Sequence, residues 1–160
     1  MPVMLKAFNI RKICLIRGST GFSSDRERRM QEFRERRQCK RFRSKEAAGA
    51  FVAIRPTFHH IGSLRDVSLG GLGFHYMVSL DKKPLSQAKD PFDADLFVAN
   101  NGFYLSKIKC RLAYDRLAEI QPMFELDVEY RECGVAFDQP TSEQKAQIAL
   151  FLEHYTEGEA

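Results

Sequence analysis

Several features that mark common classes of protein are missing from this sequence of 160 residues. There is no C-x-x-C pair, and the spacing of the four cysteines does not fit a zinc site. The longest apolar run near the N-terminus, residues 13–16, is too short for a signal-peptide core or a membrane span. We therefore expect a soluble cytoplasmic protein with no metal and no cofactor, whose cysteines are free thiols in a reducing compartment: Cys14, Cys39, Cys110 and Cys133.

Tryptophan is absent as well, but 13 phenylalanines and a hydrophobic fraction of 44% predict a globular core built partly from aromatic rings.

The charge is unevenly distributed along the sequence. The chain has a net charge of +4, yet residues 26–45 alone hold ten Lys or Arg and three Glu, which leaves −3 for the remainder. A local cationic stripe of this kind indicates an anionic partner or a solvated linker.

The N-terminal part of the chain shows no sustained periodicity up to about residue 23. Ser24 and Glu27 then have the spacing of a capping box, which predicts a helix over residues 25–37 and a basic linker that ends at Lys45. We expect an N-terminal extension over residues 1–33, flexible and then helical, followed by a β domain over residues 34–160.

Residues 50–137 have the rhythm of a β domain. The polar segment 81–91 is predicted to be a loop, and short strands at this spacing argue for a small sandwich or barrel. After them, Thr141 and Gln144 form a second capping box, and apolar residues at helical spacing predict an amphipathic helix that covers an opening or edge of the sheet. The predicted strands are residues 51–54, 64–67, 72–78, 96–98, 103–117, 124–128 and 134–137.

Two short motifs could carry chemistry. Arg37 and Arg41 form Arg-x-x-x-Arg, and residues 66–71 form Asp-x-Ser-x-x-Gly. Taken singly, the first motif is typical of a solvated charge run, and the second is typical of a turn in which Asp or Ser bonds nearby backbone amides.

Together, in this order and some 25 residues apart, the two motifs resemble those of the PilZ family. The resemblance extends to residues 41–43, 50–52, 72–74, 102–105 and 133–137, and so covers roughly residues 34–155. It implies a mainly β fold, a six-stranded antiparallel barrel with a C-terminal helix, and cyclic di-GMP as the ligand. The ligand contacts it implies are Arg37, Arg41, Asp66, Ser68 and Gly71, with Arg36 and Gly70 beside them.

The residue types suit that ligand. An arginine can fork onto the guanine O6 and N7 edge or onto a phosphate, and it can stack on a purine face. Asp66 would accept from the guanine N1 and N2 donors, a pattern that adenine does not offer. Ser68 supplies a small hydroxyl, and Gly70 and Gly71 allow close approach of the backbone.

Other polar residues suggest less. His59, His60 and His75 lack a third metal ligand at suitable spacing, so we interpret them as surface or strand histidines. Asp93 and Asp95 lack a supporting group for acid and base catalysis, and we interpret them as the solvated start of a strand. No catalytic arrangement of Ser, His and Asp or of Cys and His is recognisable.

The sequence therefore predicts a cyclic di-GMP receptor, not an enzyme, that acts through an unidentified effector protein. In this hypothesis the ligand orders the basic arm, residues 34–45, which is too polar to bury itself. Two alternatives remain. A basic arm on a small barrel also describes a nucleic-acid-binding module, for which exposed stacking aromatics beside the basic stripe would be needed. A PilZ-like scaffold that binds only protein is the other.

Overall fold

The computed structural model describes residues 39–119 and 127–160, and residues 40–160 form one compact unit. The predicted N-terminal extension and the predicted helix over residues 25–37 lie outside the described residues. The described part of the chain contains β1 (Phe42–Ser44), η2 (Glu46–Ala48), β2 (Ala50–Ile54), β3 (Ile61–Ser68), β4 (Gly71–Ser79), η3 (Leu85–Gln87), β5 (Phe92–Val98), β6 (Tyr104–Leu117), β7 (Val128–Phe137), α2 (Ser142–Tyr155) and β8 (Thr156–Glu159).

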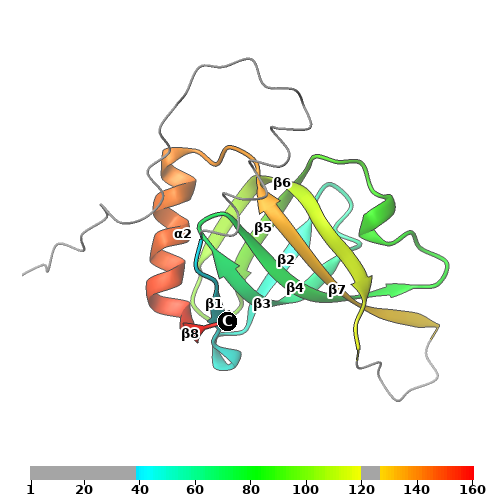
Figure 1. Ribbon diagram of the computed structural model, residues 1–160, viewed down its shortest axis with the longest axis horizontal. Coiled ribbons are helices and arrows are strands. Elements are labelled where there is room, and N and C mark those ends of the chain that lie inside the picture. Colours follow the sequence, from blue (N-terminus) through cyan, green and yellow to red (C-terminus); the bar gives the residue numbers. More distant parts are fainter. Residues whose placement is uncertain (1–38, 120–126) are drawn as a thin grey trace, which may run out of the picture. The chain divides into compact units, whose positions relative to one another are not determined.

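Six of the strands close into an antiparallel barrel, as the sequence predicts. Their order is β2-β5-β6-β7-β4-β3, and β3 pairs with β2 to complete the ring (Figure 1). Closure removes the free edges of these strands, which would otherwise offer unpaired backbone groups. Strands β1 and β8 continue the sheet outside the ring, with β1 paired to β3 and β8 paired to β1.

The core fills the barrel with side chains that alternate along the strands. On β4, Leu72, Phe74, Tyr76 and Val78 are all buried, and strand β2 contributes Val52 and Ile54. Burying a side chain of this size stabilises the fold by about 1.5–3 kcal/mol. The aromatic core that the composition predicts is therefore present.

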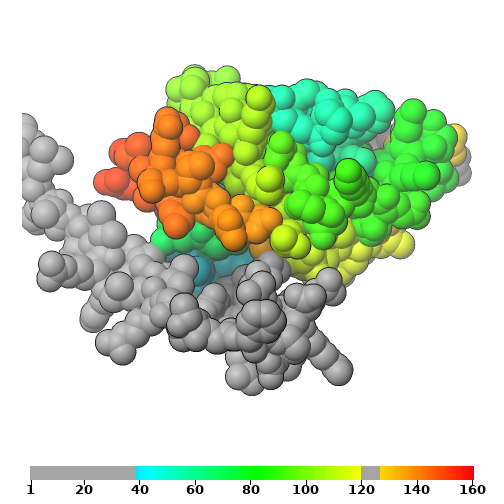
Figure 2. Space-filling view, turned by 90° about the horizontal axis from the view of Figure 1, so that it is seen from above, coloured from blue at the N-terminus to red at the C-terminus, as the bar shows by residue number. Residues whose placement is uncertain are grey.

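The C-terminal helix forms where the capping box predicts it. The Thr141 hydroxyl accepts from the Gln144 amide, and the Gln144 side chain accepts from the Thr141 amide. Ile148 and Phe151 lie on the buried face of α2 and are fully buried. The rings of Phe151 and Phe103 pack edge-on, with their centroids 5.2 Å apart. In the space-filling view the orange-to-red helix lies against the yellow-green β6 segment (Figure 2). It covers one end of the barrel.

The basic linker predicted up to Lys45 is wrong over residues 42–44. These residues form β1, because they satisfy their backbone groups against β3 on one side and β8 on the other. The sequence does not predict β8, because this polar strand has no apolar alternation. The loop predicted over residues 81–91 contains the short η3 turn, which buries Leu85. The predicted strand 124–128 lies largely outside the described residues, and β7 begins at Val128.

The prediction for Asp95 is also wrong. Its carboxylate is 1% exposed instead of solvated, and it accepts bonds from the Arg55 Nε at 2.9 Å, the Tyr104 hydroxyl at 2.6 Å and the Lys107 amide at 2.8 Å. Burial opposes ionisation of Asp95, but these bonds and the charge of Arg55 outweigh it and lower the pKa of the carboxyl. The cluster ties β2, β5 and β6 together.

None of the helices that the structure describes is long and apolar enough to cross a membrane. Within the same residues, no group of three or more His, Cys, Asp or Glu side chains is placed to hold a metal ion.

Candidate functional site

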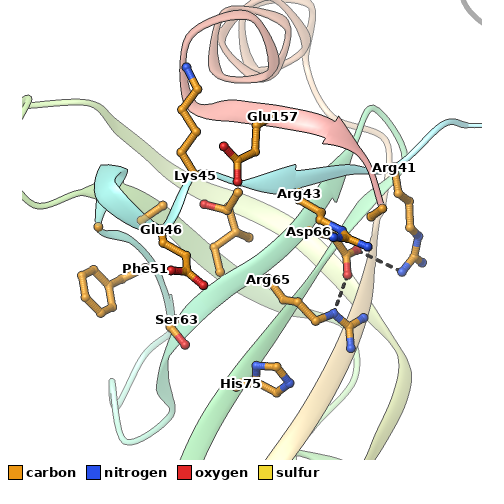
Figure 3. Close-up of a pocket in the computed structure, with 15 residues that line it drawn as sticks. Arg41, Arg43, Lys45, Glu46, Phe51, Ser63, Arg65, Asp66, His75 and Glu157 are labelled. Carbon is orange, nitrogen blue, oxygen red and sulfur yellow. Dashed lines mark hydrogen bonds and ion pairs between the residues drawn. The ribbon is translucent and has the colours of Figure 1, made fainter.

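A groove opens where β3 changes partner. The first half of β3 pairs with β2 through residues 61–63, and its second half pairs with β1 through Asp66 and Val67. Strands β1 and β2 diverge between these points and are joined over the gap by η2. The groove there has a volume of about 830 Å³, and Arg41 and Asp66 line it together (Figure 3).

Arg41 and Asp66 are 25 residues apart in sequence and in contact in the fold. The Arg41 Nη1 lies 3.1 Å from the Asp66 Oδ1, and Asp66 is 4% exposed. The structure thus brings together one residue from each predicted motif. Arg37 and Arg36 lie outside the described residues.

A second arginine, which the sequence analysis did not single out, holds the other oxygen of Asp66. The Arg65 Nε lies 2.6 Å from the Asp66 Oδ2 (Figure 3). Burial would lower the pKa of Arg65, but hydrogen bonds to Asp66 and Tyr114 and the charge of Asp66 raise it, so the guanidinium stays charged. Each carboxylate oxygen of Asp66 therefore accepts from one arginine.

A β-bulge explains how adjacent residues reach the same side of the strand. Leu64 pairs with Phe74 and Asp66 pairs with Gly73, so Arg65 is an extra residue in β3. In a regular strand Arg65 and Asp66 would point to opposite faces. A Cβ on Gly73 would lie 2.9 Å from the Arg65 Nη2 and 2.9 Å from the Asp66 Oδ2, which places both side chains over this glycine.

The Arg65 side chain continues across the sheet to β6 and β7. Its Nη2 donates to the Tyr114 hydroxyl at 2.7 Å, and its Nη1 forms an ion pair with Glu132. Arg116 also pairs with Glu132, at 3.1 Å. The network spans four strands of the barrel and fixes the position of Arg65 beside Asp66.

His75 lies next to this network and also lines the groove. Its ring stacks on that of Tyr130 at 5.3 Å. Partial burial and the nearby positive charge of Arg65 lower the pKa of His75. The ring is consequently held toward its neutral form.

Ser68, Gly70 and Gly71 are near Asp66 in sequence but do not line the groove. The Ser68 hydroxyl accepts from the Gly70 amide at 3.2 Å and donates to the Gly71 carbonyl at 3.2 Å, which is the turn that this motif commonly forms. A Cβ on Gly71 would lie 2.2 Å from the Val135 carbonyl oxygen. These contacts close the turn between β3 and β4 and position the end of β3.

Some of the residues around Asp66 that the two motifs do not include could have been found from the sequence. Arg43 follows Arg41 by two positions and shares its face once residues 42–44 are known to be a strand. Arg65 is adjacent to Asp66, but the alternation of a regular strand argues against their cooperation. Tyr114 and Glu132 come close only through the pairing of β6 with β7.

With the geometry established, comparison with solved structures places the fold. The PilZ domain of YcgR from Escherichia coli, solved with c-di-GMP, superposes with a TM-score of 0.57 at 14% identity, covering 75% of this chain and 91% of that one. MrkH, described as a c-di-GMP-dependent transcription regulatory factor, superposes with a TM-score of 0.53 at 18% identity, covering 74% of this chain. The chain spans only about half the length of MrkH, 50%.

These likenesses show that the described domain has the PilZ-type barrel fold that the motifs imply. No family model matches the sequence, and no curated protein matches it significantly.

Proposed function

We propose that this protein is a receptor for cyclic di-GMP, with Arg37, Arg41, Asp66, Ser68 and Gly71 as ligand contacts and Arg36 and Gly70 in support. The observation that carries the proposal is the contact between Arg41 and Asp66 in the groove. The two motifs meet on a PilZ-type barrel, and the two solved relatives are described as a c-di-GMP complex and a c-di-GMP-dependent factor.

Asp66 would bind the Watson–Crick edge of one guanine through its two acceptor oxygens. To do so it exchanges at least one of its arginine partners for the guanine donors. Arg41 is the partner that exchanges more easily, because its side chain is 42% exposed and it is held at 3.1 Å, whereas Arg65 is 31% exposed and has further bonds to Tyr114 and Glu132. A released Arg41 can then fork onto a guanine edge or a phosphate.

The signal would pass through the segment that precedes β1. Residues 42–44 are already paired in the sheet, so ordering by ligand concerns residues 34–41 and not the whole arm. Arg37 and Arg41 would close over the ligand and fix this segment, giving an effector protein a changed surface to recognise. Amide hydrogen exchange tests this, because amides before β1 should gain protection with cyclic di-GMP while those near Val135 change little.

Calorimetric titration with cyclic di-GMP, cyclic di-AMP and GTP tests the function itself. We expect binding of cyclic di-GMP and much weaker binding of the other two. Arg41→Ala and Arg37→Ala should each lose about 1.5–3 kcal/mol of binding free energy, the range for a hydrogen bond to a charged group. Arg111→Ala is a matched control, because Arg111 lies on β6, outside the groove, and pairs with Asp138. If Arg41→Ala and Arg37→Ala both bind cyclic di-GMP as tightly as the parent, the proposed site is wrong.

A nucleic-acid-binding module is the second candidate, and one observation favours it. Phe51, Phe97 and Tyr104 stand side by side on β2, β5 and β6, with ring centroids 5.8 and 6.5 Å apart, and Tyr104 is 53% exposed. Phe51 also lines the groove. Binding of single-stranded oligonucleotide that weakens steeply with salt, without binding of cyclic di-GMP, would support this candidate instead.

A further inference from the structure

We propose that Arg43, on β1, contacts a phosphate of the ligand, so that the sheet itself supplies one of the cationic contacts. This inference rests on the proposed function. Arg43 belongs to neither of the two motifs, and we infer that it contacts a phosphate of the ligand and not a base.

Arg43 lies directly across from Asp66. The two residues are paired in the register of β1 with β3, and side chains opposite each other in an antiparallel pair have Cβ atoms about 4.5–5.5 Å apart. Arg43 also lies on the same face of β1 as Arg41. Figure 3 draws its head group beside Asp66, at the end of the groove where Arg41 and Arg65 also converge.

The other cationic groups of the groove are already engaged. Arg41 and Arg65 take one oxygen of Asp66 each, and the Lys45 Nζ donates to the His154 carbonyl at 3.1 Å. Arg43 has neither a hydrogen bond nor an ion pair within 4.0 Å to any residue in 39–119 or 127–160. Arg43 is therefore an exposed residue whose guanidinium donors are free among these residues.

The acidic residue opposite Arg43 on strand β8 does not form an ion pair with Arg43. Glu157 on β8 is paired in register with Arg43, yet no ion pair forms between them. In Figure 3 the Glu157 carboxylate points away from the Arg43 head group. An unpaired guanidinium presents a planar fork of donors that matches two phosphate oxygens.

Strand β1 holds the backbone of Arg43 in place without help from the ligand. Besides the strand pairing, the Lys45 amide donates to the Tyr155 carbonyl at 3.0 Å, and the Ala160 amide donates to the Arg41 carbonyl at 2.9 Å. A group positioned in advance loses less entropy on binding than a group on a mobile arm. Arg43 would therefore contribute to affinity without any prior ordering of its backbone.

The test compares Arg43→Ala, Arg43→Lys and the control Arg111→Ala in titrations with cyclic di-GMP at low and high salt. Arg43 is exposed and unpaired, and Arg111 forms only a surface ion pair with Asp138, so all three variants should keep a thermal midpoint close to that of the parent. We expect Arg43→Ala to lose affinity on the order of tenfold or more, and Arg43→Lys to recover part of it, because lysine keeps the charge but not the fork. Salt should weaken binding less in Arg43→Ala than in the parent, because one interaction between opposite charges has been lost, whereas Arg43→Lys and Arg111→Ala should keep the salt dependence of the parent.

Three results would overturn the inference in distinguishable ways. If the parent binds and Arg43→Ala matches Arg111→Ala in affinity and salt dependence, Arg43 is not a contact, while the proposed function stands. If the affinity falls but the salt dependence does not, Arg43 contacts a base and not a phosphate. If the parent does not bind cyclic di-GMP, the proposed function has failed, and this inference fails with it.

Discussion

Gly73 on β4 and Gly134 on β7 face each other in register, and together they form the floor of the network that holds Asp66. A Cβ on Gly73 would meet Asp66 and Arg65, and a Cβ on Gly134 would lie 2.3 Å from the Tyr114 ring. The Arg65 side chain can cross from β3 to Tyr114 because these two positions carry no side chain.

Gly73→Ala should damage the site more than the fold. The atoms that its Cβ would meet are the ends of side chains, which can shift, so we expect a folded protein that binds cyclic di-GMP at least severalfold more weakly. Gly71→Ala should destabilise the fold itself, because its Cβ would lie 2.2 Å from the Val135 backbone oxygen. Overpacking of this kind costs about 1–3 kcal/mol. Thermal melts and titrations of both variants separate the effects, and equal melting points would contradict the prediction.

Asp66→Asn should weaken ligand binding and leave the barrel folded. The amide is nearly isosteric, but one of its two ends donates instead of accepting, so it can satisfy neither both arginines nor both guanine donors. Circular dichroism checks the fold and titration checks the binding, with Asp81→Asn in the exposed loop as the control. An unfolded Asp66→Asn protein would instead indicate that the carboxylate serves the turn and the sheet.

His75 should make the fold less stable in mild acid. Burial and the charge of Arg65 lower its pKa in the folded state, so the unfolded chain binds the proton first as the pH falls. Stability attributable to His75 is therefore complete above the unfolded pKa of about 6.5 and is lost as the pH falls below it. Urea unfolding of the parent and of His75→Gln at about pH 7.5 and 5.5 tests this. The loss should be smaller in the variant, and parallel losses would count against the prediction.

Cys110 and Cys133 should resist thiol reagents in the native protein. Both side chains are 0% exposed, and burial raises the pKa of each thiol, so the reactive thiolate is scarce and out of reach. Mass spectrometry of peptides after labelling at about pH 8 should find both unmodified, and should find both modified after denaturation. Labelling at equal rates in the two states would mean that the barrel opens readily.

The class of fold follows from local patterns in the sequence. Alternating apolar residues on β4, turn signals between strands and the Thr141–Gln144 capping box are local patterns, and the local structure followed them. The motifs predict Arg41 and Asp66 as contacts of the same ligand, and the two side chains are in contact in the fold. Arg37 and Arg36, and the ligand roles of Ser68, Gly70 and Gly71, stay predictions.

The other groups that surround Asp66 are brought there by long-range strand pairing, which the sequence does not reveal. The bulge at Arg65 reverses the facing that alternation predicts, and it depends on how β3 pairs with β4. Residues 42–44 form a strand only because β3 and β8 supply partners for a polar segment that has no apolar pattern of its own. Tyr114 and Glu132 reach Arg65 through the register of β6 and β7. Such pairings join backbone groups far apart in the chain, and backbone groups are the same in every residue, so the sequence carries little local trace of them.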